Sequence, residues 1–286
     1  YFNKNFDKYV EELNKKLKTG ISKEHSHRPA FQNFIESITG FDAVNDGKAI
    51  SCGAPDFIIQ KSLITYGHVE TKDIGIDLTK IEETEQLKRY LPALNNLILT
   101  DYVEFRWYDN AELKMTVNIG TLSNKIITVQ QSEIKNFELL LKNFFKSTRT
   151  TVSTPNELAD VLADKARILE SSLTEAFLRE NENGYFHKQL DALKNSIFPH
   201  ITIDKFLDLY TQTVCYGLFV ARCSSPEMKN FNRTNSVLCF PRSDTFLKKL
   251  FIEVSSKKLD SSITWIIDDI SELLAKSDIK KIIKNF

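Results

Sequence analysis

The chain has 286 residues, 42% of them hydrophobic and 27% charged, as expected for a folded globular protein. Its 38 basic and 38 acidic residues cancel, whereas a domain that binds DNA by overall charge has a basic excess. Any contact with nucleic acid must therefore come from a local patch or from another part of a larger protein. The sequence has no signal peptide, no apolar run long enough to span a membrane and no cysteine pair with zinc-ligand spacing, which predicts a cytoplasmic protein without a membrane partner.

The first half of the chain alternates between helix-like and strand-like segments. Apolar residues at helical spacing predict helices over 1–18 and about 22–39, and a further helix is expected over 132–145. A helix is also predicted over 82–91, with acids at its start, Lys88-Arg89 later and Pro92 at its end. Period-two patterns predict strands over 55–59, 63–72, 96–100, 103–108 and 113–119. Turns are expected at Gln60-Lys61 and at Asp109-Asn110. This order predicts an α/β domain over residues 1–150.

The second half has an almost wholly helical pattern. A polar stretch over 147–155 marks the expected boundary, and Thr154 followed by Pro155 is typical of a helix start. Amphipathic segments cover 156–181, 185–196, 202–222, 243–256 and 261–275. We therefore expect a second, all-α domain over residues 151–286. The chain begins without Met and ends after a basic helix, as expected for a piece of a longer protein.

One group of charged residues in the first half points to chemistry. Asp56 stands at the start of one expected strand, and Glu70 and Lys72 stand on the next. Residues i and i+2 of a strand share a face, so Glu70 and Lys72 should point the same way. Two carboxylates held close together favour a divalent cation, and Mg²⁺ prefers such oxygen ligands. A neighbouring lysine can orient or deprotonate a water molecule and offset negative charge on a phosphorane, which is what phosphodiester hydrolysis requires.

Pro55-Asp56 followed by Glu70-Thr71-Lys72 resembles the signature of the PD-(D/E)XK nuclease superfamily. Gln86 and Tyr90 match the Gln-x-x-x-Tyr element of its RecB-like branch and would share one helix face. The resemblance implies a restriction-endonuclease-like fold, a mixed central sheet flanked by helices. It also implies a site in which Asp56, Glu70 and the carbonyl of Thr71 bind Mg²⁺, or Mn²⁺ in its place.

The same superfamily usually has a further acid on its first core helix. Glu24 is the first candidate for this position and Glu36 the second. His25, His27 and Arg28 lie where the start of a basic helix could approach a phosphate. Nearby, Asp73 and Asp77 are interpreted as parts of a loop, not as further ligands.

The run from Gly53 to Tyr108 is also similar to the amino-terminal nuclease region of large restriction-modification enzymes of type IIG. In those enzymes a helical connector joins the nuclease to an adenine methyltransferase, and the second half of this chain, with Trp265 near its end, resembles that connector. The Asn-Pro-Pro-Tyr motif of the methyltransferase is absent from the sequence. The resemblance therefore implies DNA as a partner, together with methyltransferase and target-recognition domains of the same polypeptide, and allows dimerisation on DNA.

These observations predict a Mg²⁺-dependent endodeoxyribonuclease module. An alternative is a non-cleaving DNA-binding or scaffolding module that docks a methyltransferase. A third possibility is a helical protein-interaction domain beside an incidental α/β partner. The aromatic residues Phe105, Trp107 and Tyr108 are expected in the core and on the sheet, not on a base-stacking platform.

Overall fold

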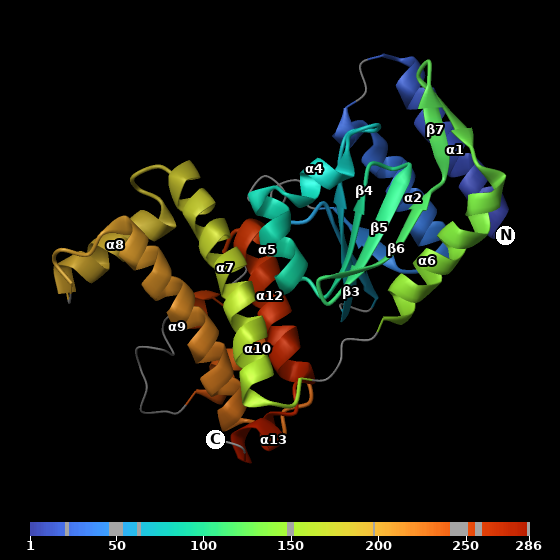
Figure 1. Ribbon diagram of the computed structural model, residues 1–286. Coiled ribbons are helices and arrows are strands. Elements are labelled where there is room, and N and C mark those ends of the chain that lie inside the picture. The colour runs from blue at the N-terminus through green and yellow to red at the C-terminus, as the bar shows by residue number, and fades with distance from the viewer. Residues whose placement is uncertain are drawn as a thin grey trace. The chain divides into compact units, whose positions relative to one another are not determined.

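The computed structural model describes residues 1–20, 23–45, 54–61, 64–147, 152–196, 198–240, 251–254 and 259–284 (Figure 1). The chain divides into two compact units. The first unit comprises residues 1–46 and 55–149, and the second comprises residues 47–54 and 150–286.

The first unit is built around a mixed six-stranded sheet whose order is β1-β2-β3-β4-β5-β6. Its strands are β1 (Asp42–Val44), β2 (Phe57–Lys61), β3 (Ile64–Thr71), β4 (Asn96–Thr100), β5 (Glu104–Asp109) and β6 (Glu112–Asn118). All neighbours pair antiparallel except β3 and β4, which pair parallel. A separate two-stranded ribbon follows, formed by β7 (Gly120–Ser123) and β8 (Ile126–Val129). The mixed sheet with its helices agrees with the expected α/β architecture.

The helices of this unit cover both faces of the sheet (Figure 1). They are α1 (Phe2–Lys18), α2 (Glu24–Thr39), α4 (Leu78–Glu82), α5 (Glu85–Ala93) and α6 (Ile134–Lys146), with a 3₁₀ turn at Gln131–Glu133. A single hydrophobic core joins α1, α2 and α6 to one face, to which strand alternation sends Val69, Ile98 and Phe105. The ring of Phe105 stacks on that of Phe31 of α2, and its centroid lies 4.4 Å from that of Phe137 of α6.

The opposite face of the sheet carries α4 and α5, which form the crossover between the parallel strands β3 and β4 (Figure 1). Leu97 and Leu99 of β4 alternate with Ile98 and are fully buried, as is Leu87 of α5. Glu70 pairs with Leu99 across the parallel ladder and shares its face. The alternation of β3 therefore directs Glu70 toward the α5 side and Thr71 toward the α2 side.

Several local expectations need correction. Gln60 and Lys61 do not form the hairpin turn but continue β2, pairing with Thr65 and Ile64 after a register shift between Ile59 and Gln60; residues 62–63 lie outside the described residues. The second turn is one residue later than expected, at Asn110-Ala111, where both residues have positive φ. Pro92 does not end α5 but lies within its last turn.

The regular secondary structure of the second unit is helical in the ranges that the structure describes. Its helices are α7 (Pro155–Arg179), α8 (Tyr185–Ser196), α9 (Ile203–Ser224), α10 (Arg233–Ser236), α12 (Ser261–Lys276) and α13 (Ile279–Lys284), with a 3₁₀ turn at Val237–Cys239. Thr154 caps α7 and Pro155 is its first residue, as expected. Of the helix expected over 243–256, residues 251–254 are helical and the remainder lies outside the described residues.

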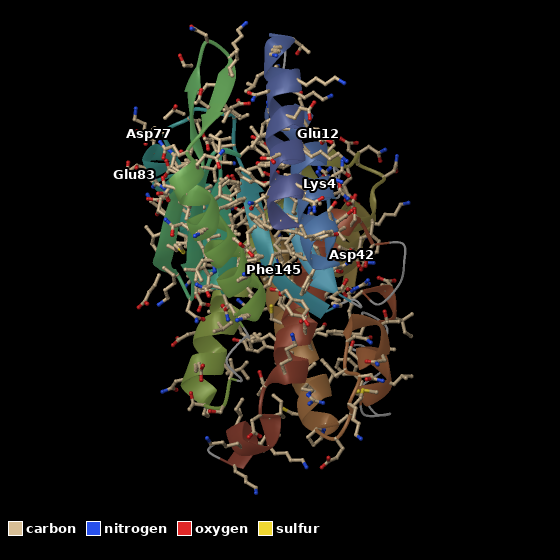
Figure 2. The ribbon with its side chains drawn as sticks, turned by 90° about the vertical axis from the view of Figure 1, so that its right-hand side faces the viewer. Lys4, Glu12, Asp42, Asp77, Glu83 and Phe145 are labelled. Carbon is tan, nitrogen blue, oxygen red and sulfur yellow. The ribbon has the colours of Figure 1, made fainter. Side chains whose placement is uncertain are left out.

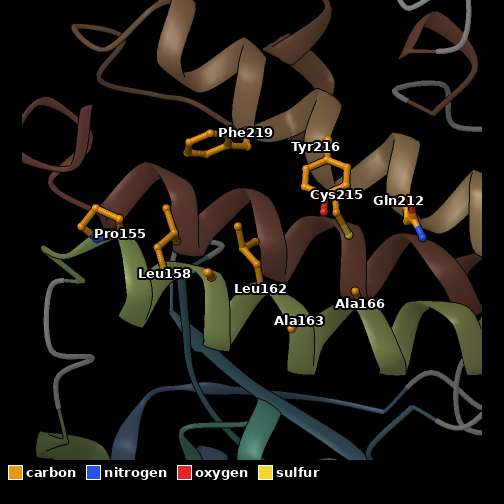
Figure 3. Close-up of a pocket in the computed structure, with 10 residues that line it drawn as sticks. Pro155, Leu158, Leu162, Ala163, Ala166, Gln212, Cys215, Tyr216 and Phe219 are labelled. Atoms are coloured by element: carbon orange, nitrogen blue, oxygen red, sulfur yellow. The ribbon is translucent and has the colours of Figure 1, made fainter. Parts of the chain in front are cut away.

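Two features characterise the interior of the second unit. A buried ion pair joins Lys165 of α7 to Asp269 of α12. An apolar pocket of about 240 Å³ lies between α7 and α9, lined by such side chains as Leu158, Leu162 and Phe219 (Figure 3). This lining offers no carboxylate or imidazole, so the pocket is unsuited to a hard cation. Across the described residues, no helix is both long and apolar enough to cross a membrane.

Candidate functional site

The carboxylate of Asp56 is held from two sides. Asp56 lies just before β2, is 3% exposed and accepts hydrogen bonds at Oδ2 from the backbone N–H of Thr71 (2.7 Å) and from its hydroxyl (2.6 Å). Its Oδ1 accepts a hydrogen bond from Nη2 of Arg28. A carboxylate offers about four lone-pair positions, so these three donors fix its orientation and leave one position for another partner.

Glu70 and Lys72 form an ion pair at the end of β3. Glu70 is 2% exposed, and burial followed by the charge of Asp56 raises its pKa to about 8 despite the nearby ammonium. Burial alone would lower the pKa of Lys72, but the acids Glu70, Asp56 and Glu24 together outweigh this effect, and the pKa lies above its usual value. Lys72 is therefore a cation near neutral pH.

Glu24 and Arg28 connect the first turn of α2 to this group. One guanidinium nitrogen of Arg28, Nη2, donates to Oε1 of Glu24 (2.6 Å) and to Asp56, so a single cation bridges two acids. Glu36 lies elsewhere, where Oε1 accepts hydrogen bonds from Gln32 (3.0 Å) and from the backbone N–H of Ala43 (3.2 Å). The structure thus brings Glu24 toward Asp56 and leaves Glu36 at the edge strand β1.

Gln86 and Tyr90 lie on one face of α5, as their spacing predicts. Nε2 of Gln86 donates to the hydroxyl of Tyr90 at 3.2 Å. Burial and then the negative charge of Glu70 raise the pKa of Tyr90, which puts its ring within electrostatic range of the carboxylates. These two side chains therefore approach the group from the face opposite α2.

Tyr102 also belongs to this group, although the sequence analysis did not single it out. It follows β4, is fully buried and has a φ of +71°, a left-handed conformation that costs a bulky residue about 1–3 kcal/mol. Its hydroxyl donates to the carbonyl of Glu24 (2.9 Å), and its own carbonyl accepts from Tyr9 (2.8 Å). No local motif indicated Tyr102, but the strand order could have done so. The carboxyl ends of parallel strands such as β3 and β4 meet at one edge of a sheet, so a residue that follows β4 lies near residues at the end of β3.

The donors present fit a hard divalent cation. Oε2 of Glu70 is buried and has no hydrogen-bond partner among the described residues, which is unfavourable for a carboxylate unless a cation satisfies it. Within the same residues no group of three or more His, Cys, Asp or Glu side chains is arranged to hold a metal ion, so a cation here would rely on two carboxylates and other oxygens. Two carboxylates and a backbone carbonyl suit Mg²⁺, which usually keeps several water ligands.

The residues at the start of α2 differ from their expected roles. Arg28 is buried and bound to carboxylates, so it is not an exposed phosphate contact in this arrangement. His27 is buried too, with its ring 5.5 Å from that of Tyr102, whereas His25 is exposed. Asp73 and Asp77 lie in a loop, as interpreted, and each caps a helix, accepting from the N–H of Glu24 and of Thr79.

Comparison with solved structures finds only weak similarity, over part of the chain. No family model matches the sequence, and no curated protein matches it. Among solved structures, the cryo-EM structure of a DrdV–DNA complex is similar to part of the chain, with 23% identity, 50% of this chain and 97% of that chain covered, and a TM-score of 0.40. A match of this extent does not assign a function to the chain.

Proposed function

We propose that the first unit is a metal-dependent endodeoxyribonuclease of the PD-(D/E)XK type. The observation that carries this proposal is the buried carboxylate of Glu70, which lies beside Asp56 and Lys72 with Oε2 unpartnered among the described residues. Burying an acid against a second acid is costly for folding, and proteins tolerate such costs mainly at functional sites. The second unit would serve as the helical connector to methyltransferase and target-recognition domains of a longer polypeptide.

Asp56, Glu70 and the carbonyl of Thr71 would hold Mg²⁺ or Mn²⁺, with Glu24 as a candidate for a further direct or water-mediated contact. In an extended strand the N–H and C=O of one residue point to the same side, and the N–H of Thr71 points at Asp56. The carbonyl of Thr71 would therefore face the same space. When bound, the cation would supply a Lewis acid and lower the pKa of a coordinated water.

Lys72 would act as a charged positioning group. Its raised pKa keeps the ammonium protonated, so it would orient the attacking water and offset negative charge on the phosphorane instead of taking the proton itself. Gln86 and Tyr90 would support Glu70 from α5 or hold the DNA backbone. Tyr102 would position the first turn of α2 without contacting the substrate.

A plasmid-nicking assay with Mg²⁺ or Mn²⁺ tests this proposal directly. Asp56→Ala and Lys72→Ala should abolish nicking while the protein stays folded. The chain contains a matched control, because Glu112 and Lys114 of β6 repeat the Glu-x-Lys spacing and its ion pair on an exposed strand. Glu112→Gln and Lys114→Ala should nick DNA as the unchanged protein does.

Thermal unfolding separates cleavage from cation binding. A ligand that binds only the folded state raises the melting temperature, so Mg²⁺ and Mn²⁺ should stabilise the unchanged protein and not Asp56→Ala. Stabilisation without nicking would favour the non-cleaving module, and the assay should then be repeated on the full-length enzyme. Nicking by Asp56→Ala, or no effect of either cation, would exclude the proposed site.

A further inference from the structure

We propose that the β7–β8 ribbon and the last turn of α1 form a binding surface for duplex DNA on the first unit. This inference rests on the proposed function, because it gives the substrate of the same site a place to bind. The chain as a whole is neutral, so such a surface requires a local excess of positive charge.

The ribbon has the architecture and side chains that suit an element entering a DNA groove. It is separate from the main sheet, and the major groove of B-DNA admits a two-stranded ribbon. Its exposed side chains are mostly small and polar, while Leu122 and Ile126 remain 42% and 45% exposed. Short hydroxyl and amide groups can bond to phosphates and base edges, and apolar side chains can contact thymine methyl groups.

The ribbon is fixed to α1. The side-chain amide of Asn14 accepts from the N–H of Ile127 (2.7 Å) and donates to its carbonyl (3.3 Å), and so pairs with β8 as a neighbouring strand would. Ile127 is buried in the core of the unit. Figures 1 and 2 both show the tip of the ribbon at the same end of the unit as the carboxyl end of α1.

Positive charge gathers at this end. Lys15, Lys16 and Lys18 occupy the last turn of α1, and Nζ of Lys125, at the ribbon tip, would lie 3.1 Å from a Cβ added to Gly20. All four lysines are exposed, and none forms an ion pair with an acid in the described part of the chain.

Three acids near this end are already engaged. Glu12, one turn earlier on α1, pairs with Lys8. Asp73 and Asp77 cap the amino ends of α2 and α4, where the helix dipole offsets their charge. None of these three acids forms an ion pair with the four lysines among the described residues.

This surface is continuous with the rim of the candidate site. Leu122 of the ribbon would lie 3.4 Å from a Cβ added to Gly75, in the loop that directly follows Lys72. Oδ2 of Asp101 accepts from the N–H of Gly75 (2.8 Å) and fixes this loop at the end of β4. On the other side, the charge of Lys16 acts to lower the pKa of His27, whose ring contacts that of Tyr102. A duplex on the ribbon would thus extend toward the carboxylates.

Lys125 itself occupies an unfavourable backbone position. Asn124 and Lys125 have φ of +50° and +61°, the conformation of a tight hairpin turn in which glycine is preferred at the second position. A lysine here costs stability that glycine would not. A residue that weakens the fold and carries an unpaired charge at a ribbon tip fits a binding role better than a structural one.

The test measures binding of the full chain to a fluorescein-labelled duplex of random sequence by anisotropy, without divalent metal, at low and at physiological salt. The combined change Lys16→Glu, Lys18→Glu and Lys125→Glu should weaken binding about tenfold or more and lower the salt dependence, because each lost phosphate contact removes about 0.9 from the slope. The matched control is Lys4→Glu, Lys135→Glu and Lys146→Glu, which makes the same charge change at the far end of α1 and on α6 (Figure 2). It should bind as the unchanged protein does.

A second pair of variants separates folding from binding. Lys125→Gly should raise the melting temperature and weaken DNA binding. Ala111→Gly relieves the same backbone conformation in the β5–β6 turn, where φ is +64°, and should raise the melting temperature without affecting binding. Three outcomes would each overturn the proposed surface. Lys125→Gly could bind as the unchanged protein does, or the two triple variants could lose binding equally. The third outcome is no binding of the unchanged protein at low salt.

The surface and the catalytic proposal can fail separately. Asp56→Ala should bind the duplex normally and not cut it. The triple lysine variant should keep the stabilisation by Mn²⁺ that the metal site predicts. If Asp56→Ala cuts DNA while the lysine variant loses binding, the surface stands and the assigned site does not.

Discussion

The hydroxyl of Tyr102 donates a hydrogen bond to the carbonyl of Glu24 at 2.9 Å and ties the end of β4 to the first turn of α2. The backbone of Tyr102 is in the left-handed region, which the surrounding structure must enforce. Its N–H donates to Oγ1 of Thr100 (2.8 Å), and its carbonyl accepts from Tyr9. Glu24 therefore owes its place near Asp56 in part to a residue 78 positions later in the chain.

Removing this hydroxyl should loosen the first turn of α2. We expect Tyr102→Phe to lower the free energy of unfolding of the first unit by about 1 kcal/mol, the usual net value of a buried hydrogen bond. Urea unfolding followed by Trp107 fluorescence in a Trp265→Phe background reports on this unit alone, because the chain has only these two tryptophans. Tyr1→Phe, which removes an exposed hydrogen bond to the carbonyl of Ser37, is the matched control and should have little effect. Equal effects of the two changes would contradict the buried role of Tyr102.

Arg28 should compete with a divalent cation for the same acids. Arg28→Met leaves Glu24 and Asp56 without their shared guanidinium, and breaking a buried ion pair costs about 3–5 kcal/mol. The variant should therefore be strongly destabilised without metal and should gain more from Mn²⁺ than the unchanged protein does. The measurement is the melting temperature with and without Mn²⁺, with Lys8→Met, which removes an exposed ion pair, as the control. An unchanged gain from Mn²⁺ would show that the two cations do not share these ligands.

Cation binding should depend on the protonation of Glu70. Its pKa of about 8 lies above that of an exposed glutamate, so in the absence of metal this carboxyl favours folding most at acidic pH and progressively less as the pH rises to about 8. A cation must displace the proton, so the apparent affinity for Mn²⁺ should rise about tenfold per pH unit up to pH 8 and then level off. Titration calorimetry between pH 6 and 9 measures this dependence. Glu112→Gln should show the same profile as the unchanged protein, and Glu70→Gln should bind Mn²⁺ weakly at every pH.

The ion pair between Lys165 and Asp269 should behave differently from those at the surface. Both side chains are almost completely buried, so Lys165→Met leaves a buried carboxylate and should destabilise the second unit by about 3 kcal/mol or more. The double variant Lys165→Met with Asp269→Leu should recover most of this loss. Urea unfolding followed by Trp265 fluorescence in a Trp107→Phe background measures both, with Lys276→Met, which breaks the helical pair with Glu272, as the control. A double variant no more stable than Lys165→Met alone would contradict this account.

What the sequence predicts well in this protein is local. The strands that carry Asp56, Glu70 and Lys72 follow from alternation over a few residues, and the shared face of Gln86 and Tyr90 follows from helical periodicity. The strands β1, β7 and β8 were not predicted, since runs of three or four residues are too short to show a period. The turn of β7–β8 also lacks the glycine that usually marks it.

What the sequence did not predict depends on distant parts of the chain. Arg28 was expected at a phosphate, but tertiary packing places it between Glu24 and Asp56, 28 positions away from the latter. The choice between Glu24 and Glu36 likewise required the position of β1, whose Ala43 engages Glu36. No local pattern carries this information, because it arises only when α2 packs on the sheet.

The hairpin that carries the acids also has a consequence for the order of assembly. Asp56 and Thr71 are 15 positions apart, whereas the contact between Tyr102 and Glu24 spans 78, and closing the longer loop costs about 1.5 kcal/mol more in chain entropy. The two carboxylates should therefore meet early in folding, before α2 brings the guanidinium that offsets their charge. A dissolved divalent cation would relieve that repulsion in the meantime. We thus expect Mg²⁺ to accelerate folding of the first unit as well as to stabilise its folded state.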